Sequence, residues 1–336
     1  MSAINKSVSV WEQLVQLPFL NLYSRLLNAA MELDVFSQLC QPVTAKALAV
    51  QMGWHEANTE YLLSALVSIG FLSNTDGAYQ NTEEADRYLV KGRDEYLGGF
   101  LPFYMQEGMA PMDVKLLVTK GPQPQQQEAM EQQLDFASFA QRMRQAQEGY
   151  RQQELLRIVR SLPENGEIRR VLDLGGATGL LGLAVIGDRP DRTGVLFDRF
   201  PPAVVEESIS LMGLTDRTEV MCGNFMADRI GERYDLILAL NVMLFAKGRM
   251  EELLKKCYDA LNPGGVLLVI SEAILPDHTG PWDMVMGYLP YYFQGMDMGV
   301  LKNEVSDAAT RVGFTNCEKR TERLCSGTQD IDIIRK

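Results

Sequence analysis

A glycine-rich run with an acidic residue inside it follows an apolar stretch in the middle of this sequence. The run is Val171-Leu-Asp-Leu-Gly-Gly-Ala-Thr-Gly179. Glycines at these places let a strand turn sharply into a helix and let a ligand approach the backbone closely. The spacing differs from the GxGxxG of dinucleotide-binding folds, in which a helix N-terminus holds a pyrophosphate. Asp173 would repel a pyrophosphate, whereas it suits a ligand that carries a cationic aminoacyl group.

A second acidic residue, Asp198, directly follows the next apolar run, Gly194-Val-Leu-Phe197. A carboxylate at the end of a second strand is well placed to hold two ribose hydroxyls. The glycines and the two acids together therefore predict a site for a ligand with both a ribose and a cationic group. The alternative is an α/β fold without a nucleotide, in which these glycines serve only the turn.

These residues lie where short apolar runs alternate with helix-like stretches. Strands are predicted at 171–174, 194–197, 219–222, 235–238 and 266–270, and two closing strands at 314–319 and 330–334 after a helix over 302–312. This rhythm is typical of βαβ units with right-handed crossovers around a buried parallel sheet. We predict an α/β, doubly wound domain over 161–336.

The first 110 residues predict helices followed by a small hairpin. Apolar residues at three- and four-residue spacing predict a helix over 11–33, with a kink or a restart at Pro18. Two short helices at 44–53 and 58–69 and a hairpin over 71–82 complete a winged-helix layout. The helix over 58–69 has no Lys or Arg to meet phosphate, so packing is favoured over DNA binding. The long apolar face of 11–33 predicts a homodimer.

Segment 111–160 separates the two parts, and we predict a helical linker that lends residues to the site. Its polar stretch Gly121–Gln127 is rich in Pro and Gln, which is typical of an exposed loop. The apolar periodicity from Phe136 to Leu162 predicts one long helix. The predicted domains are thus 1–110, 111–160 and 161–336.

The charge and the residue composition of the chain disfavour several classes of binding partner and site. Of the 336 residues, 44 are acidic and 32 basic, and the net charge of −12 disfavours nucleic acid and membrane surfaces as partners. With neither a leader-like start nor a long apolar run, we expect a cytosolic protein. Five scattered cysteines without a CxxC pair and only two histidines predict no disulfide and no metal site.

Four segments resemble the successive motifs of class I S-adenosylmethionine-dependent methyltransferases: Asp173 to Gly179, Phe197-Asp198, Gly223-Asn-Phe225 and Leu261-Asn-Pro-Gly-Gly265. With the winged-helix part in front, nearly the whole chain resembles the dimeric O-methyltransferases of plants and bacteria that act on phenols and polyketides, including relatives that methylate carbon on tetrapyrroles. The resemblance implies a Rossmann-like catalytic domain behind a winged-helix dimerisation domain. It also implies S-adenosylmethionine as cofactor and O- or C-methylation of a small, aromatic or hydrophobic acceptor.

The resemblance also implies which residues bind the cofactor. Gly175, Gly176 and Ala177 would approach its methionyl part, and Asp198 would hold its ribose. Where the family usually has Asp, this chain has Asn224, whose amide oxygen accepts the same hydrogen bond from adenine more weakly. The full implied set is Asp173, Gly175, Gly176, Ala177, Asp198, Arg199, Asn224, Phe225, Met226 and Asn241.

The chain departs from the family at the usual catalytic base. Members that methylate hydroxyls carry a His after the fourth strand of this domain, and alignment places Leu244 there. We favour catalysis by orientation, which is worth ~7–11 kcal/mol in well-aligned reactions. A second hypothesis takes the base from the segment after the fifth strand, with the candidates His278, Tyr288, Tyr291 and Tyr292. In a third, the protein binds the cofactor for another purpose or is a silent dimeric scaffold.

The segment 282–298 is crowded with Met and aromatic residues, which adapt to bulky flat ligands. Together with apolar residues elsewhere, it predicts an apolar acceptor pocket. The predicted lining is Phe139, Met143, Met243, Leu244, Phe245, Tyr291 and Met296.

Overall fold

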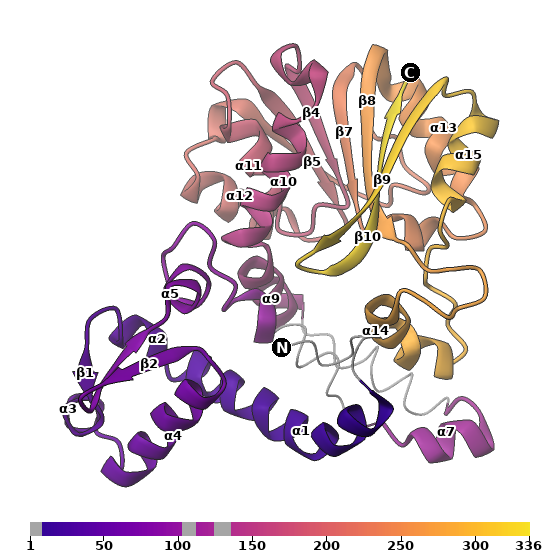
Figure 1. Cartoon of the computed structure of the whole chain (residues 1–336). Helices are drawn as coiled ribbons and strands as arrows, with labels where there is room; N and C mark the ends of the chain where they lie inside the picture. The colour runs from indigo at the N-terminus through magenta and orange to yellow at the C-terminus, as the bar shows by residue number, and fades with distance from the viewer. Residues whose placement is uncertain (1–8, 103–111, 124–135) are drawn as a thin grey trace. The chain divides into compact units, whose positions relative to one another are not determined.

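The computed structural model of the chain describes residues 9–102, 112–123 and 136–336, with the side chains of 136–139 excepted. The chain divides into two compact units, residues 1–107 and 108–336, and each is considered by itself (Figure 1). The predicted loop Gly121–Gln127 lies largely outside the described residues.

The first unit is a small helical domain with a three-stranded sheet. Its elements are α1 (Val10–Glu32), α2 (Val35–Gln38), β1 (Val43–Thr44), α3 (Ala45–Met52), α4 (Glu56–Ser68), β2 (Leu72–Thr75), β3 (Ala78–Asn81) and α5 (Glu83–Leu89). The strands pair antiparallel in the order β1-β3-β2. Thr44 begins α3 by accepting a hydrogen bond from the Ala47 amide, and Gly53 ends it in a left-handed conformation. The predicted winged-helix layout is confirmed.

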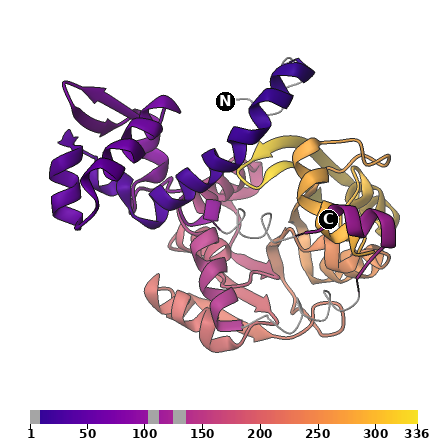
Figure 2. The ribbon, with the colours of Figure 1, turned by 90° about the horizontal axis from the view of Figure 1, so that it is seen from below.

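Helix α1 is continuous through Pro18, so of the two predicted alternatives, a kink or a restart, the restart does not occur. Only Leu27, Ala30 and Met31 are buried in α1, and all three lie in its C-terminal part. Figure 2 shows the N-terminal half of α1 extending away from the other helices of its own unit. Its large apolar side chains are therefore exposed, among them Trp11, Leu14, Leu17, Phe19 and Leu22.

The second unit is built on a seven-stranded sheet in the order β6-β5-β4-β7-β8-β10-β9. The strands are β4 (Arg170–Leu174), β5 (Thr193–Asp198), β6 (Thr218–Cys222), β7 (Tyr234–Leu240), β8 (Leu261–Glu272), β9 (Asn316–Leu324) and β10 (Gly327–Arg335). The first five are parallel to one another, whereas β10 is antiparallel to both β8 and β9. All seven predicted strands are present, and each is longer than predicted, β8 and β10 most of all.

Helices cover both faces of this sheet (Figure 1). Apolar residues of α10 (Tyr150–Arg160), α11 (Leu180–Gly187) and α12 (Pro202–Leu211) pack on one face. Those of α13 (Met250–Ala260) and α15 (Glu304–Val312) pack on the other. Because both faces are covered, the central strands are apolar along nearly their whole length. The prediction of a doubly wound α/β domain is confirmed.

Four further helices lie toward the carboxyl ends of the parallel strands, which Figure 1 shows at the lower edge of the sheet. They are α7 (Val114–Lys120), α9 (Phe136–Gln147), α14 (Trp282–Phe293) and the short 3-10 helix η3 (Met243–Ala246). The prediction of one helix over 136–162 was wrong, because Gly149, at a φ of 65°, separates α9 from α10. In the described part of the chain, no helix is both long and apolar enough to cross a membrane.

Candidate active site

The glycine turn and the segment after β7 meet at the point where the strand order reverses. From β4 the chain moves to β5 and β6 on one side, and it returns to β7 on the other side of β4. Open α/β sheets bind ligands outside the carboxyl ends of the strands at such a point. A methyl group added to Gly175 would lie 2.5 Å from Cγ1 of Val242, so the two segments are in close contact.

The glycine turn has little room for side chains. Gly175 has a φ of 72°, and its amide donates to the carbonyl of Phe197 at 2.8 Å. A methyl group on Gly176 would lie 2.2 Å from Oδ2 of Asp173. The turn therefore depends on glycine at 176 because the Asp173 carboxyl occupies the adjacent space.

Asp173 is a buried acid behind this turn. Its side chain is 1% exposed, and Oδ2 accepts a hydrogen bond from the Gly182 amide at 3.1 Å. Burial raises the pKa of Asp173 to about 7, and the nearby Asp198 carboxylate acts in the same direction. A cationic ligand group beside Asp173 would favour its ionised form, so the residue fits the predicted aminoacyl group.

Asp198 ends β5 and is held by the backbone on both sides. Its Oδ2 accepts from the Ala177 amide at 2.8 Å, and its Oδ1 accepts from the Phe200 amide at 3.0 Å. Each carboxylate oxygen can accept a further hydrogen bond. Asp198 can therefore bind two hydroxyls while staying fixed to the turn. The neighbouring Arg199 is exposed, and its contact with a cofactor stays a prediction.

The loop after β6 holds Phe225 against the glycine turn. A methyl group on Gly175 would lie 3.5 Å from the Phe225 ring, and Lys256 fixes the loop by donating to the Phe225 carbonyl at 2.8 Å. Asn224 is exposed, and its Oδ1 already accepts from the Met226 amide at 3.0 Å. This oxygen retains one lone pair for an adenine amine.

Helix α9 covers the turn with residues that the sequence analysis missed. The Gln147 side chain donates to the Gly176 carbonyl at 3.1 Å and accepts from the Thr178 hydroxyl at 2.6 Å. Nothing in the sequence pointed to Gln147, because its role depends on how α9 packs. The predicted pocket residue Met143 is half-buried in a cluster with Ala177. The side chain of Phe139 lies outside the described residues.

A buried acid at the end of β8 was also missed. Glu272 is 1% exposed, and its Oε1 accepts from the Tyr288 hydroxyl at 2.5 Å and from the Asn241 side chain at 3.3 Å. Burial raises the pKa of Glu272, whereas these hydrogen bonds lower it. The signal in the sequence was an acid that follows the apolar run 266–270 after a single serine.

The other aromatic candidates lie on and before α14. Tyr292 packs edge-on against His278, with ring centroids 5.2 Å apart. Burial raises the pKa of Tyr292 to about 12, and Asp297 and Glu272 add to the shift. Tyr292 thus stays protonated near neutral pH and is poorly suited as a base. His278 is exposed, and Tyr291 lies 6.0 Å from Tyr288 by ring centroids.

The three residues around the expected base position differ in exposure. Met243 is fully buried in the core under α13, so packing accounts for its apolar character. Leu244 is half-buried and Phe245 is 62% exposed. None of the three side chains can accept a proton.

The segment that carries these residues is fixed to the region after α14. Lys247, which follows η3, donates to the Gly299 carbonyl at 2.5 Å and pairs with Asp297 at 2.6 Å. The predicted pocket residue Met296 is half-buried in the same region. The segments that carry Leu244 and Met296 are thus held together by the contacts of Lys247.

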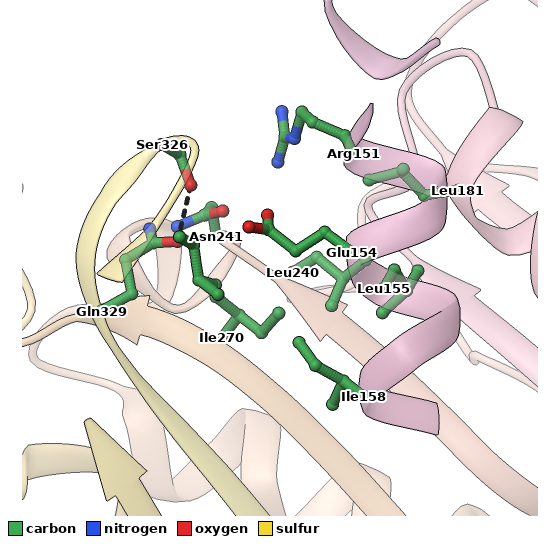
Figure 3. Close-up of a pocket in the computed structure, with 11 residues that line it drawn as sticks. Arg151, Glu154, Leu155, Ile158, Leu181, Leu240, Asn241, Ile270, Ser326 and Gln329 are labelled. Atoms are coloured by element: carbon green, nitrogen blue, oxygen red, sulfur yellow. Dashed lines mark hydrogen bonds between the residues drawn. The ribbon is translucent and has the colours of Figure 1, made fainter. Parts of the chain in front are cut away.

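A hollow opens between α10 and the turn that joins β9 to β10 (Figure 3). Figure 3 shows Glu154 reaching from α10 into the space beside Asn241, with Ser326 and Gln329 on the opposite wall. The space in this hollow that a water-sized molecule can occupy is only about 20 Å³. Ligand pockets commonly span about 300–1,000 Å³. The hollow therefore has little room for a bulky acceptor.

Both units match known sequence families. Residues 15–91 match the family described as O-methyltransferase dimerisation domain, and residues 126–315 match the family described as O-methyltransferase domain. A 3-hydroxy-5-methyl-1-naphthoate 3-O-methyltransferase of Streptomyces sahachiroi is 28% identical over 270 residues, which cover 77% of this chain and 76% of that protein. A bacteriochlorophyllide d C-20 methyltransferase of Chlorobaculum tepidum is 25% identical and covers 92% of this chain and 89% of its own length.

A solved structure shows the same fold. Human N-acetylserotonin methyltransferase in complex with S-adenosylmethionine superimposes with a TM-score of 0.74 at 20% identity. The match covers 99% of each chain.

Proposed function

Since this chain belongs to the O-methyltransferase family and is an S-adenosylmethionine-dependent methyltransferase, we propose that its acceptor is a small aromatic or otherwise hydrophobic molecule. The observation that carries the cofactor-dependent methyl transfer is the glycine turn at the reversal of the strand order, with Asp173 and Asp198 beside it. Those two acids suit the cationic and ribose parts of this cofactor.

We assign the cofactor contacts as follows. The backbone of Gly175, Gly176 and Ala177 lies beside the methionyl part, and Asp198 binds the ribose hydroxyls. Asn224, Phe225 and Met226 flank the adenine. The bound cofactor supplies a methyl group on a positively charged sulfur, and the chain's own task is to orient the acceptor in line with it.

The acceptor class rests on the apolar residues near the ends of β7 and β8. Leu244, Phe245, Tyr291 and Met296 are exposed or half-buried there, as an aromatic pocket requires. The names of the two relatives point the same way, since a hydroxynaphthoate and a bacteriochlorophyllide are flat aromatic molecules. One is methylated on oxygen and the other at a numbered ring carbon, so both atom types stay within the proposal.

We also propose that the chain works as a homodimer. The family match over 15–91 is to a dimerisation domain. The exposed apolar side chains of α1 give that unit an uncovered surface of the kind that pairs with a second copy.

Calorimetric titration with S-adenosylmethionine and with S-adenosylhomocysteine tests the cofactor site. We expect micromolar binding of both, followed by mass-spectrometric detection of an added methyl group on hydroxynaphthalene acceptors. Binding of both without transfer to any acceptor would favour the silent scaffold. Absence of binding would contradict the site itself.

A further inference from the structure

Strand β8 ends in a carboxyl group with one oxygen that has no partner. Glu272 is 1% exposed, and among the described residues its Oε2 has no hydrogen-bond partner. Buried polar atoms in folded proteins are nearly always hydrogen-bonded, so an unsatisfied carboxylate oxygen requires an explanation. A bound ligand that donates a hydrogen bond is one such explanation.

The other oxygen of Glu272 is fully engaged. Oε1 accepts from the hydroxyl of Tyr288 on α14 and from the side-chain amide of Asn241 after β7. Two donors on the same oxygen fix the plane of the carboxyl group and leave Oε2 available. A carboxyl group that is held by one oxygen can react through the other, and this arrangement is typical of preorganised functional sites.

Glu272 also lies close to the cofactor turn. Asn241, which donates to Glu272, is followed by Val242, and Val242 is in contact with Gly175. The carboxyl group is therefore two short contacts from the segment assigned to the methionyl part of the cofactor. An acceptor held between the two would have its reacting atom near both.

We propose that Glu272 is the catalytic base of this methyltransferase and that its Oε2 accepts the proton of the acceptor's hydroxyl group. The inference rests on the proposed methyl transfer to an aromatic acceptor. The acceptor oxygen gives an electron pair to the methyl carbon, and the carbon–sulfur bond breaks with its pair kept on sulfur. The hydroxyl proton moves to Oε2, and the neutral carboxyl group releases it to solvent after the product leaves.

The titratable groups around Glu272 are compatible with this role. Tyr288 and Tyr292 face it from α14, whereas its neighbours from β7 and β10, Asn241 and Gln329, carry no charge. Burial raises the pKa of Glu272, so its ionised form is a stronger base than an exposed glutamate. Leu244 has no proton acceptor, Tyr292 stays protonated and His278 is exposed, whereas Glu272 is buried and its Oε2 has no partner among the described residues.

The test compares Glu272→Gln with the wild type on two acceptors, 2-naphthol and the more acidic 4-nitrophenol. General-base catalysis contributes about 10²–10⁴-fold, so we expect kcat on 2-naphthol to fall by about that factor. The loss on 4-nitrophenol should be much smaller, because much of that phenol is already ionised. Binding of S-adenosylhomocysteine should be unchanged.

Asp332→Asn is the matched control. Asp332 is a buried acid in the same sheet, lies opposite Val269 of β8, and has a pKa that burial raises to about 6. It is not part of the proposed site. We expect this variant to keep activity on both acceptors.

Tyr288→Phe supplies a readout that a purely structural role would not change. The hydrogen bond from Tyr288 lowers the pKa of Glu272, so its removal should raise that pKa. The low-pH limb of kcat/KM should then shift to higher pH, and it should disappear in Glu272→Gln.

Three results would overturn the inference. Full activity of Glu272→Gln, or equal losses on both phenols, excludes Glu272 as the base while leaving methyl transfer intact. A wild type that binds S-adenosylhomocysteine but methylates neither phenol overturns the proposed acceptor class and the base with it.

Discussion

Asp173 and Asp198 are both carboxylates beside the glycine turn, but their surroundings differ. Asp198 is half-buried, and its two carboxylate oxygens accept hydrogen bonds from the backbone amides of Ala177 and Phe200. Asp173 is fully buried with one amide donor, and burial raises its pKa to about 7. We therefore expect Asp198 to contribute mainly affinity and Asp173 to make binding sensitive to pH.

Replacing Asp198 with Ala should weaken binding of S-adenosylhomocysteine. Loss of charge-assisted hydrogen bonds to the ribose costs about 1.5–3 kcal/mol, or roughly 10- to 150-fold in Kd. Calorimetry measures the change. Glu219→Ala on β6 is the control, because its side chain is 66% exposed and only pairs with Arg170, and we expect no change there. Equal affinities for Asp198→Ala and the wild type would refute the assignment of the ribose.

Binding of S-adenosylmethionine should release a proton from Asp173. Just below its pKa of about 7 this carboxyl group is mostly protonated, and a cationic ligand beside it lowers that pKa. Ligand binding therefore releases protons from Asp173, and the number released falls as the pH rises above the pKa of Asp173 in the unliganded protein. Titrations in buffers of different ionisation enthalpy detect it. Asp173→Asn should show no such release, and an unchanged release would assign the proton to another group.

At the level of elements, the glycine in the turn before α11 and the glycine that ends α11 have very different surroundings. A methyl group on Gly176 would lie 2.2 Å from Oδ2 of Asp173, whereas one on Gly187, at the other end of α11, would meet only Leu214 at 3.6 Å. The first contact is a clash and the second is ordinary packing.

Gly176→Ala should therefore lose stability and cofactor binding, whereas Gly187→Ala should keep both. Overpacking in a closed site costs about 1–3 kcal/mol, and Gly to Ala at a permitted position changes stability by about 1 kcal/mol or less. Urea unfolding gives the stabilities, and calorimetry with S-adenosylhomocysteine gives the affinities. Equal stabilities and equal affinities for the two alanine variants would show that the contact between residue 176 and Asp173 does not determine the requirement for glycine.

The strands were predictable because their apolar runs are local signals. The places of the glycine motif and of Asp198 were predictable too, since the motif directly follows β4 and Asp198 ends β5. The break between α9 and α10 was not, because the apolar periodicity continues across Gly149. Gln147 and Glu272 were missed for a related reason: their partners are distant in sequence and become neighbours only when the sheet and helices assemble.

At the scale of the whole molecule, the exposed face of α1 predicts the state of assembly. Leu14→Glu together with Leu22→Glu places charges on two side chains that are 60% and 65% exposed, and burying those charges in a dimer would be costly. We expect the double variant to be monomeric by light scattering. Val50→Glu on α3, where the side chain is 75% exposed, is the control and should leave the dimer intact. A double variant that stays dimeric would place the interface elsewhere.

The position of β10 has a consequence for how this protein is made. Strand β8, which carries Glu272, pairs on one side with β7 and on the other with β10, so its second partner emerges from the ribosome more than fifty residues later. Until then β8 is an open, strongly apolar edge that invites pairing with other nascent chains. The strand that bears the proposed base thus keeps one unpaired edge until β10 has been translated.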